Sequence, residues 1–166
     1  VDYALDNGLM SGVSDREFAP GSTLTRAMVA QMLYSLEGNP AAGSADFADV
    51  AEDAWYADAI SWAAGEGIVS GYGDTFGPND PITREQLAAI LYRYAQNEGY
   101  KTSQSGKGTE GYLDASSISN YAVKAMDWAV NAGLLSGKGN NTLAPTAGAT
   151  RAEVAQIFMN FCEDIA

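Results

Sequence analysis

The stretch Gly71-Tyr-Gly-Asp-Thr-Phe-Gly-Pro-Asn-Asp-Pro-Ile-Thr-Arg-Glu-Gln86 sets out a plan that the chain uses three times. A loop rich in Gly, Asp and Pro ends in a Thr-Arg pair, and a hydrophobic run of helical period follows it. Counting three, six, seven and ten residues forward from each Arg reaches an apolar side chain every time. This spacing predicts a helix with one core-facing stripe in each copy. The three pairs are Thr25-Arg26, Thr83-Arg84 and Thr150-Arg151.

Each Thr-Arg pair stands where such a helix must begin. A Thr followed three residues later by Glu or Gln is a capping box, in which the hydroxyl accepts from a first-turn N–H and the longer side chain reaches back. Thr83 with Gln86 and Thr150 with Glu153 fit it fully, whereas Thr25 keeps only the hydroxyl half. The cap does not explain the Arg, because a cation is unfavourable at the positive end of a helix macrodipole. A helix start with an added cation suits an anion.

A further helix is predicted before each loop. Residues 55–67 and 121–133 superpose at an offset of 66, which places Trp62 on Trp128. Each of these helices ends at a Gly followed by an apolar residue, as in a left-handed C-terminal cap. The first copy begins inside this helix, so that Tyr3 stands in the place of the tryptophans. We expect the three aromatic side chains to pack in the core.

The repeating unit is therefore helix, structured loop and capped helix. Its length of about 55 to 65 residues is typical of a repeat architecture. One unit is too small to bury its apolar stripe alone, so the copies should pack on one another as one all-α domain. The predicted repeats are 1–45, which is truncated at its N-terminus, 46–108 and 109–166. Gly and Ser are frequent in 37–44 and 103–111, which are interpreted as flexible connectors.

Composition limits the classes of function. The 166 residues are 46% hydrophobic and 18% charged, as in ordinary globular domains. A net charge of −12 disfavours nucleic acid and anionic membrane surfaces as partners. No segment approaches the roughly 18 consecutive apolar residues of a membrane span, so membrane insertion is not expected. The one cysteine, Cys162, lies in an apolar helical pattern and is interpreted as a small buried hydrophobe.

Catalysis has little support in the sequence. The chain has no His, which excludes Ser-His-Asp and Cys-His catalysis and His-ligated zinc. A carboxylate pair can hydrolyse glycosides, but Asp74, Asp80 and Glu85 are interpreted as turn and cap residues around a helix start. The acidic segment 46–53 lacks EF-hand spacing and is interpreted as a solvated turn. No catalytic residue, metal or cofactor is therefore expected.

The chain resembles a tandem of S-layer homology (SLH) repeats over nearly all of its length. Departures from the family pattern are Met28 for the motif's Glu, Glu85-Gln86 for Ala-Glu, and Ala149 for the usual Leu or Ile before Thr150. The matching residues are Phe47-x-Asp-Val50, Trp55-Tyr56, Ala63, residues 67–72, Phe76-x-Pro78 and residues 82–86, with Leu24-Thr-Arg-Ala27 and Thr150-Arg-Ala-Glu153 as further copies of the Thr-Arg-Ala-Glu motif.

The resemblance implies three helix-loop-helix repeats in a pseudo-threefold arrangement around a central helical bundle, with grooves between neighbours. It also implies a secreted module at the bacterial cell surface that attaches the remainder of a surface protein to a secondary cell-wall polysaccharide or another wall glycan. In many Gram-positive bacteria this polymer bears pyruvate ketals, and the motif Arg pairs with the ketal carboxylate. The alternative is a module that assembles with other surface proteins and binds no glycan.

The candidate ligand-binding residues lie at the helix starts and in the loops. Arg84 is expected to hold a glycan carboxylate bidentately, helped by first-turn N–H groups, and to add little stability to the unliganded fold. The alternative for the arginines is an exposed or acid-paired helix residue. Tyr72 is expected to stack on a sugar face, and the loop glycines either admit a ligand to the backbone or form the turn. The full set is Arg26, Arg84, Arg151, Thr83, Tyr72, Gly71, Gly12 and Gly137.

Overall fold

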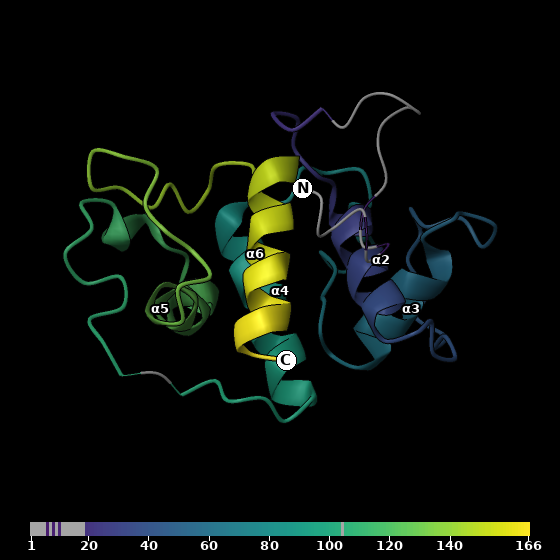
Figure 1. Cartoon of the computed structure of the whole chain (residues 1–166). Helices are drawn as coiled ribbons and strands as arrows, with labels where there is room; N and C mark the ends of the chain where they lie inside the picture. Colours follow the sequence, from purple (N-terminus) through teal and green to yellow (C-terminus); the bar gives the residue numbers. More distant parts are fainter. Residues whose placement is uncertain (1–5, 7, 9, 11–18, 104) are drawn as a thin grey trace.

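The computed structural model describes residues 6, 8, 10, 19–103 and 105–166, and the predictions for Tyr3 and Gly12 fall outside this set. Its described part is built of α-helices, with isolated β-bridges and no sheet among the described residues, so the predicted all-α class is confirmed (Figure 1). None of the described helices is long and apolar enough to cross a bilayer. The helices are α2 (Arg26–Leu36), α3 (Ala57–Gly65), α4 (Arg84–Asn97), α5 (Val123–Asn131) and α6 (Arg151–Asp164), with short 3-10 turns at Ala115–Ser117 and Asn120–Ala122.

Helices α2, α4 and α6 begin directly after a Thr, as the capping pattern predicts. The hydroxyl of Thr83 accepts from the N–H of Gln86, and the Gln86 side chain accepts from the N–H of Thr83. Thr150 and Glu153 make the same two bonds. Thr25 caps with its hydroxyl alone. The predicted helix starts are therefore confirmed in all three copies.

The helices pack in pairs that cross the repeat boundaries. Helix α2 packs on α3 and α4 packs on α5, so the second helix of one repeat lies against the first helix of the next (Figure 1). The ring of Trp62 in α3 lies 5.7 Å from that of Tyr34 in α2, and Trp128 in α5 lies 5.5 Å from Tyr92 in α4. Both tryptophans are buried, as predicted.

Three backbone hydrogen bonds join the repeats in a closed ring. The N–H of Leu24 donates to the C=O of Ala149 (3.2 Å), the N–H of Ala149 to Ile82 (2.9 Å), and the N–H of Ile82 to Leu24 (2.8 Å). Each of these buried residues directly precedes the capping Thr of its repeat. The three helix starts are therefore held together at one point. This ring is compatible with the pseudo-threefold arrangement of complete repeats, which stays a prediction.

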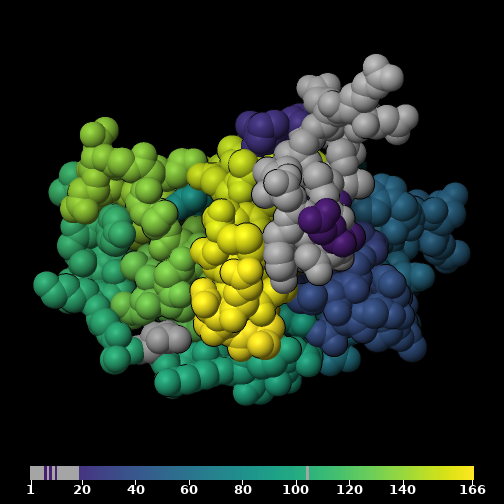
Figure 2. Space-filling model, viewed as in Figure 1, coloured from purple at the N-terminus to yellow at the C-terminus, as the bar shows by residue number. Residues whose placement is uncertain are grey.

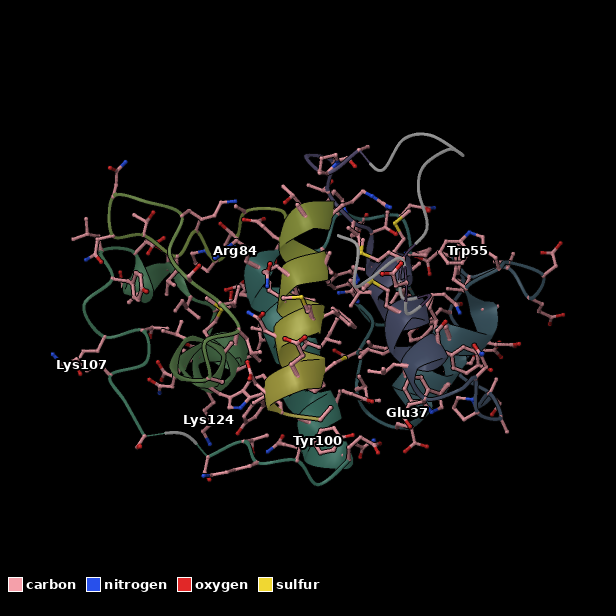
Figure 3. The ribbon with its side chains drawn as sticks, in the orientation of Figure 1. Glu37, Trp55, Arg84, Tyr100, Lys107 and Lys124 are labelled. Carbon is pink, nitrogen blue, oxygen red and sulfur yellow. The ribbon has the colours of Figure 1, made fainter. Side chains whose placement is uncertain are left out.

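A polar contact and an aromatic cluster join α2, α4 and α6 at their other ends. The buried hydroxyl of Tyr94 in α4 donates to the carboxylate of Glu37, which caps the end of α2. Burial, with the hydrogen bond to Glu37, raises the pKa of Tyr94. The rings of Tyr94, Tyr100 and Phe161 contact one another beside it, and Cys162 is half-buried against the same core. Tyr100 and Glu37 are labelled in Figure 3.

The connectors predicted to be flexible are docked on the helices. In the first, the C=O of Pro40 accepts from the hydroxyl of Tyr34 (2.7 Å). In the second, the N–H and the hydroxyl of Thr109 donate to Asp127 of α5 (2.8 and 2.7 Å), and Thr109 is buried. The prediction of flexibility is wrong at these points, because side chains of the flanking helices bind the connector.

Replacing Trp62 by Ala should lower the free energy of unfolding by about 3–5 kcal/mol, because the loss of a buried tryptophan leaves a cavity that its neighbours fill only in part. Urea denaturation followed by circular dichroism measures the change. Trp55 is the matched control, since it is 61% exposed. Its replacement by Ala should change the free energy by less than about 1 kcal/mol. Equal losses in the two variants would contradict the packing described here.

Candidate functional site

The Gly-rich loops of the second and third repeats are each fixed by a carboxylate from the segment that leads into the repeat. Asp49 accepts from the N–H groups of residues 76–77 (2.7 and 2.8 Å). Asp114 accepts in the same way from residues 143–144 (2.8 and 2.7 Å). Burial acts to raise the pKa of Asp49, but these N–H bonds outweigh it and lower the pKa. Among the described residues no group of three or more acidic, His or Cys side chains is placed to hold a metal ion.

Arg26 extends from the start of α2 into the loop of the second repeat. Its Nε donates to the C=O of Phe76 (3.0 Å) and its Nη2 to the C=O of Ser70 (2.8 Å). The guanidinium carbon lies 4.5 Å from the centre of the Phe76 ring and 4.7 Å from that of Tyr72, where the ring faces attract a cation. Within the described part of the chain, Arg26 has no ion pair and its Nη1 has no hydrogen-bond partner.

Arg84, labelled in Figure 3, occupies the loop of the third repeat in the same manner and makes an ion pair in addition. Its Nε donates to the C=O of Leu143 (2.8 Å) and its Nη2 to the C=O of Ser136 (2.6 Å). Its Nη1 lies 3.2 Å from Oε1 of Glu153, and the ammonium of Lys138 binds the same oxygen. The charge of Arg84 is therefore already paired within the chain.

The contacts of Arg84 make it part of the fold. Its side chain is 3% exposed and bridges two repeats. Burial lowers the pKa of Arg84, and the charges of Glu153 and Asp114 oppose that shift. These contacts argue against the expectation that Arg84 adds little stability without ligand, because its guanidinium binds two carbonyl groups of the loop.

The first-turn N–H groups are also engaged. In α4, the N–H groups of residues 84–85 donate to the C=O groups of Ala147 and Pro145 (3.0 and 2.9 Å), and Thr83 takes the next N–H as helix cap. The equivalent groups of α2 donate to residues 78–80 of the next loop. These bonds occupy the N–H groups expected to help bind an anion. A ligand contact of Thr83 stays a prediction.

Two equivalent grooves lie beside the buried arginines. We call them groove A, of about 390 Å³, and groove B, of about 150 Å³. Groove B opens where the loop of the third repeat meets α6, which lie side by side in Figure 2. The lining of groove A includes Arg26, Gly71, Tyr72, Gln86, Arg93 and Tyr121. The lining of groove B includes Arg84, Gly137, Lys138, Glu153 and Asn160.

The candidate ligand-binding residues are divided between the two grooves. Arg26 and Tyr72 meet in groove A, whereas Arg84 and Gly137 meet in groove B. Arg84 and Tyr72 line different grooves, because Arg26 and Arg84 each reach forward into the loop of the following repeat. Arg151 is buried at the start of α6.

Packing accounts for the loop glycines. A Cβ at Gly71 would lie 2.5 Å from the ring of Phe47, and one at Gly137 would lie 3.1 Å from the ring of Tyr112. The loops of the second and third repeats therefore close over an aromatic side chain from their own lead-in segments. Approach of a ligand to the backbone here stays a prediction.

Sequence reasoning missed several residues of groove A. Arg93 lies seven residues after Gln86 on the same face of α4. The equivalent residue of the third repeat is Asn160, so the repeat pattern does not single out Arg93 as a functional residue. Tyr121 comes from the lead-in of the next repeat. Glu85 is buried, and its carboxylate accepts from the N–H and hydroxyl of Ser119 (2.9 and 2.7 Å).

The carboxylates considered for hydrolysis are not assembled into a site. Glu85 lines groove A, but Asp74 and Asp80 are exposed on the loop and do not line it. Among the described residues Glu85 is the one acidic side chain in the lining.

Comparison with known proteins agrees with the repeat pattern. The S-layer homology domain family matches residues 1–28, 46–88 and 111–155. The chain belongs to this family.

Relatives share the sequence over short parts of longer proteins. An amylopullulanase of Thermoanaerobacterium thermosulfurigenes is 38% identical over 98% of the chain, which covers 9% of that protein. The surface-layer 125 kDa protein of Lysinibacillus sphaericus is 32% identical over 99% of the chain and 14% of its own length. A cellulosome-anchoring protein of Acetivibrio thermocellus is 32% identical over 82% of the chain and 31% of its length.

Replacing Arg84 by Ala should lower the free energy of unfolding by about 2–4 kcal/mol, because each buried carbonyl left without a donor costs about 1–3 kcal/mol. Urea denaturation measures the loss. Arg93 serves as control, since it makes no hydrogen bond or ion pair with the described residues. Arg93→Ala should cost less than about 1 kcal/mol. An unchanged melting temperature in Arg84→Ala would show that its contacts add no stability.

Asp114→Asn should change how stability depends on pH. The N–H bond from Leu143, with that from Ala144, lowers the pKa of Asp114 more than burial raises it. The carboxylate therefore stabilises the fold above its unfolded pKa of about 4, and this contribution is lost as the pH falls through the folded pKa. The variant should be less stable at neutral pH by about 1–2 kcal/mol, because an amide cannot accept both bonds.

The difference between wild type and Asp114→Asn should shrink as the pH falls below about 4. Urea denaturation across pH 3 to 7 measures it. Asp164→Asn, at the exposed end of α6, controls for the lost charge and should show no comparable loss at neutral pH. A wild-type advantage that stays constant to low pH would contradict the role given to Asp114.

Proposed function

We propose that this chain is a non-catalytic anchoring module of the bacterial cell surface that binds an anionic cell-wall polysaccharide through grooves between its repeats. Family membership supports the anchoring role, as do relatives named as a surface-layer protein and a cellulosome-anchoring protein. The amylopullulanase shares the sequence over only 9% of its length, as expected for a module attached to different proteins.

The charge in groove A supports an anionic ligand. Arg93 and the Nη1 atom of Arg26 have no hydrogen-bond partner among the described residues. The carboxylate of Glu85 is directed to Ser119 and does not pair with either guanidinium. A ligand carboxylate in this groove would accept charge-assisted hydrogen bonds, which are roughly twice as strong as neutral ones.

The rim of groove A supports a sugar as the carrier of that charge. Tyr72 and Tyr121 line the groove and are 56% and 54% exposed. Each offers an apolar ring face and a hydroxyl group, which suits a ligand with apolar and polar sides. A pyruvate ketal on an aminosugar places a carboxylate directly on such a ring, and we propose it as the bound group.

The net charge of −12 opposes binding of an acidic polymer. At physiological salt, however, exposed charges more than about 8–10 Å apart are largely screened. The guanidinium groups that contact the ligand act at shorter range. Local charge in the groove therefore decides the attraction.

Arg93→Gln should weaken binding to purified cell-wall sacculi about tenfold, the effect of losing one charge-assisted hydrogen bond of about 1.5 kcal/mol. Sedimentation of the protein with sacculi at increasing sacculus concentration measures it. Lys124→Gln removes an exposed cation that does not line groove A and should leave binding unchanged. Thermal unfolding of both variants checks that the fold is retained.

Acid extraction of the secondary polymer from the sacculi should abolish binding of the wild type. Binding that survives extraction and is unaffected by Arg93→Gln would refute the proposal that the module binds a cell-wall glycan. It would favour the alternative, in which the module assembles with surface proteins and binds no sugar.

A further inference from the structure

We propose that groove A binds the anionic ligand and that groove B is closed to anions by the chain's own carboxylate, Glu153, which bridges Arg84 and Lys138. The inference rests on the proposed function and assigns it to one of the two described grooves. Glu153 thus determines which groove binds the ligand. Its capping role is not what distinguishes the grooves, because α4 and α6 both begin with a capping box.

The two grooves differ at matched positions. Gln86 and Glu153 each stand three residues after the capping Thr of their helix, and both line their groove. Tyr72 and Lys138 each follow the Gly of the Ser-Gly pair. Groove A therefore has a neutral amide and a phenol where groove B has a carboxylate and an ammonium.

In groove B the carboxylate of Glu153 is bound on both oxygens. Oε1 contacts Nη1 of Arg84 at 3.2 Å and also the ammonium of Lys138, while Oε2 accepts from the N–H of Thr150 (2.9 Å). A ligand carboxylate must displace Oε1 from Arg84. Because Glu153 belongs to the same chain, it competes at the high effective concentration of an intramolecular group.

In groove A none of the described carboxylates pairs with Arg26. Gln86 accepts from the N–H of Thr83 (3.1 Å) and donates to the hydroxyl of Tyr72 (3.0 Å). The volume of about 390 Å³ also exceeds the 150 Å³ of groove B. A sugar ring with its substituent therefore has both space and an unpaired guanidinium edge.

The difference is one of geometry, not of total charge. Groove A is lined by two arginines and one glutamate, and groove B by one arginine, one lysine and one glutamate, so their formal charges are equal. In groove A the carboxylate of Glu85 is held by Ser119. In groove B the carboxylate is held by the guanidinium that a ligand would need. If net charge alone decided binding, the two grooves would bind an anion equally well. If the position of the carboxylate decides it, groove A binds more tightly, and an experiment can distinguish these outcomes.

Glu153→Gln is the deciding variant, because it removes the charge and keeps the cap. Gln86 shows that a Gln at this position forms both capping bonds in this fold. The probe is the methyl glycoside of an N-acetylhexosamine bearing a pyruvate ketal. The readout is the amide NMR signal of Gly71 for groove A and of Gly137 for groove B, so binding is resolved groove by groove.

In the wild type, the signal of Gly71 should titrate at probe concentrations at least about tenfold lower than that of Gly137, as the loss of one charge-assisted bond implies. In Glu153→Gln, the dissociation constant at Gly137 should fall about tenfold while that at Gly71 stays the same. Glu163→Gln removes an exposed carboxylate of the same helix outside groove B and should change neither.

The reverse exchange tests groove A. The double variant Gln86→Glu with Tyr72→Lys installs the groove B pair beside Arg26 and should weaken the response of Gly71 about tenfold. Equal dissociation constants at Gly71 and Gly137 in the wild type would overturn the inference. The inference would also be overturned if Glu153→Gln left the dissociation constant at Gly137 unchanged while the signal of Gly71 still titrated. If neither signal responds in any variant, the proposed function fails together with the inference.

Discussion

Helices α2, α4 and α6 begin on carbonyl groups supplied by another repeat. The first N–H groups of a helix have no partner within it, and here those of α2, α4 and α6 donate to the loops of the second, third and first repeats. Arg26 and Arg84 extend the same contact by binding two further carbonyls of the loop they enter. Backbone groups of each repeat are thus satisfied by hydrogen bonds to another repeat.

This interlocking places the grooves. A loop held from outside by Asp49 and from inside by Arg26 has a fixed shape, and groove A lies between that loop and α4. The residue that anchors the loop also presents charge to the groove. Under the proposed function, structure and binding both depend on Arg26, and variants of that arginine should alter both. Groove residues that carry no such contacts, such as Arg93, separate the two effects.

Local patterns predicted much of the fold. The capping Thr residues and the periodic apolar side chains indicated the starts of α4 and α6, and the burial of Trp62 and Trp128 followed from helical spacing. Contacts between residues far apart in the sequence could not be predicted from local patterns. Which loop Arg84 enters depends on the order of packing, and the pairing of Arg84 with Glu153 joins residues 69 positions apart. The docking of Thr109 on Asp127 is hidden in a segment whose composition suggests a linker.

The ring formed by Leu24, Ile82 and Ala149 uses backbone groups only. Any residue other than proline carries the N–H and C=O that it needs, and the three positions already hold side chains of different size. The hydrogen bonds of this joint therefore place few demands on side-chain identity. Residues lining one groove can change without altering the joint, so each groove of a single chain is free to acquire its own ligand preference.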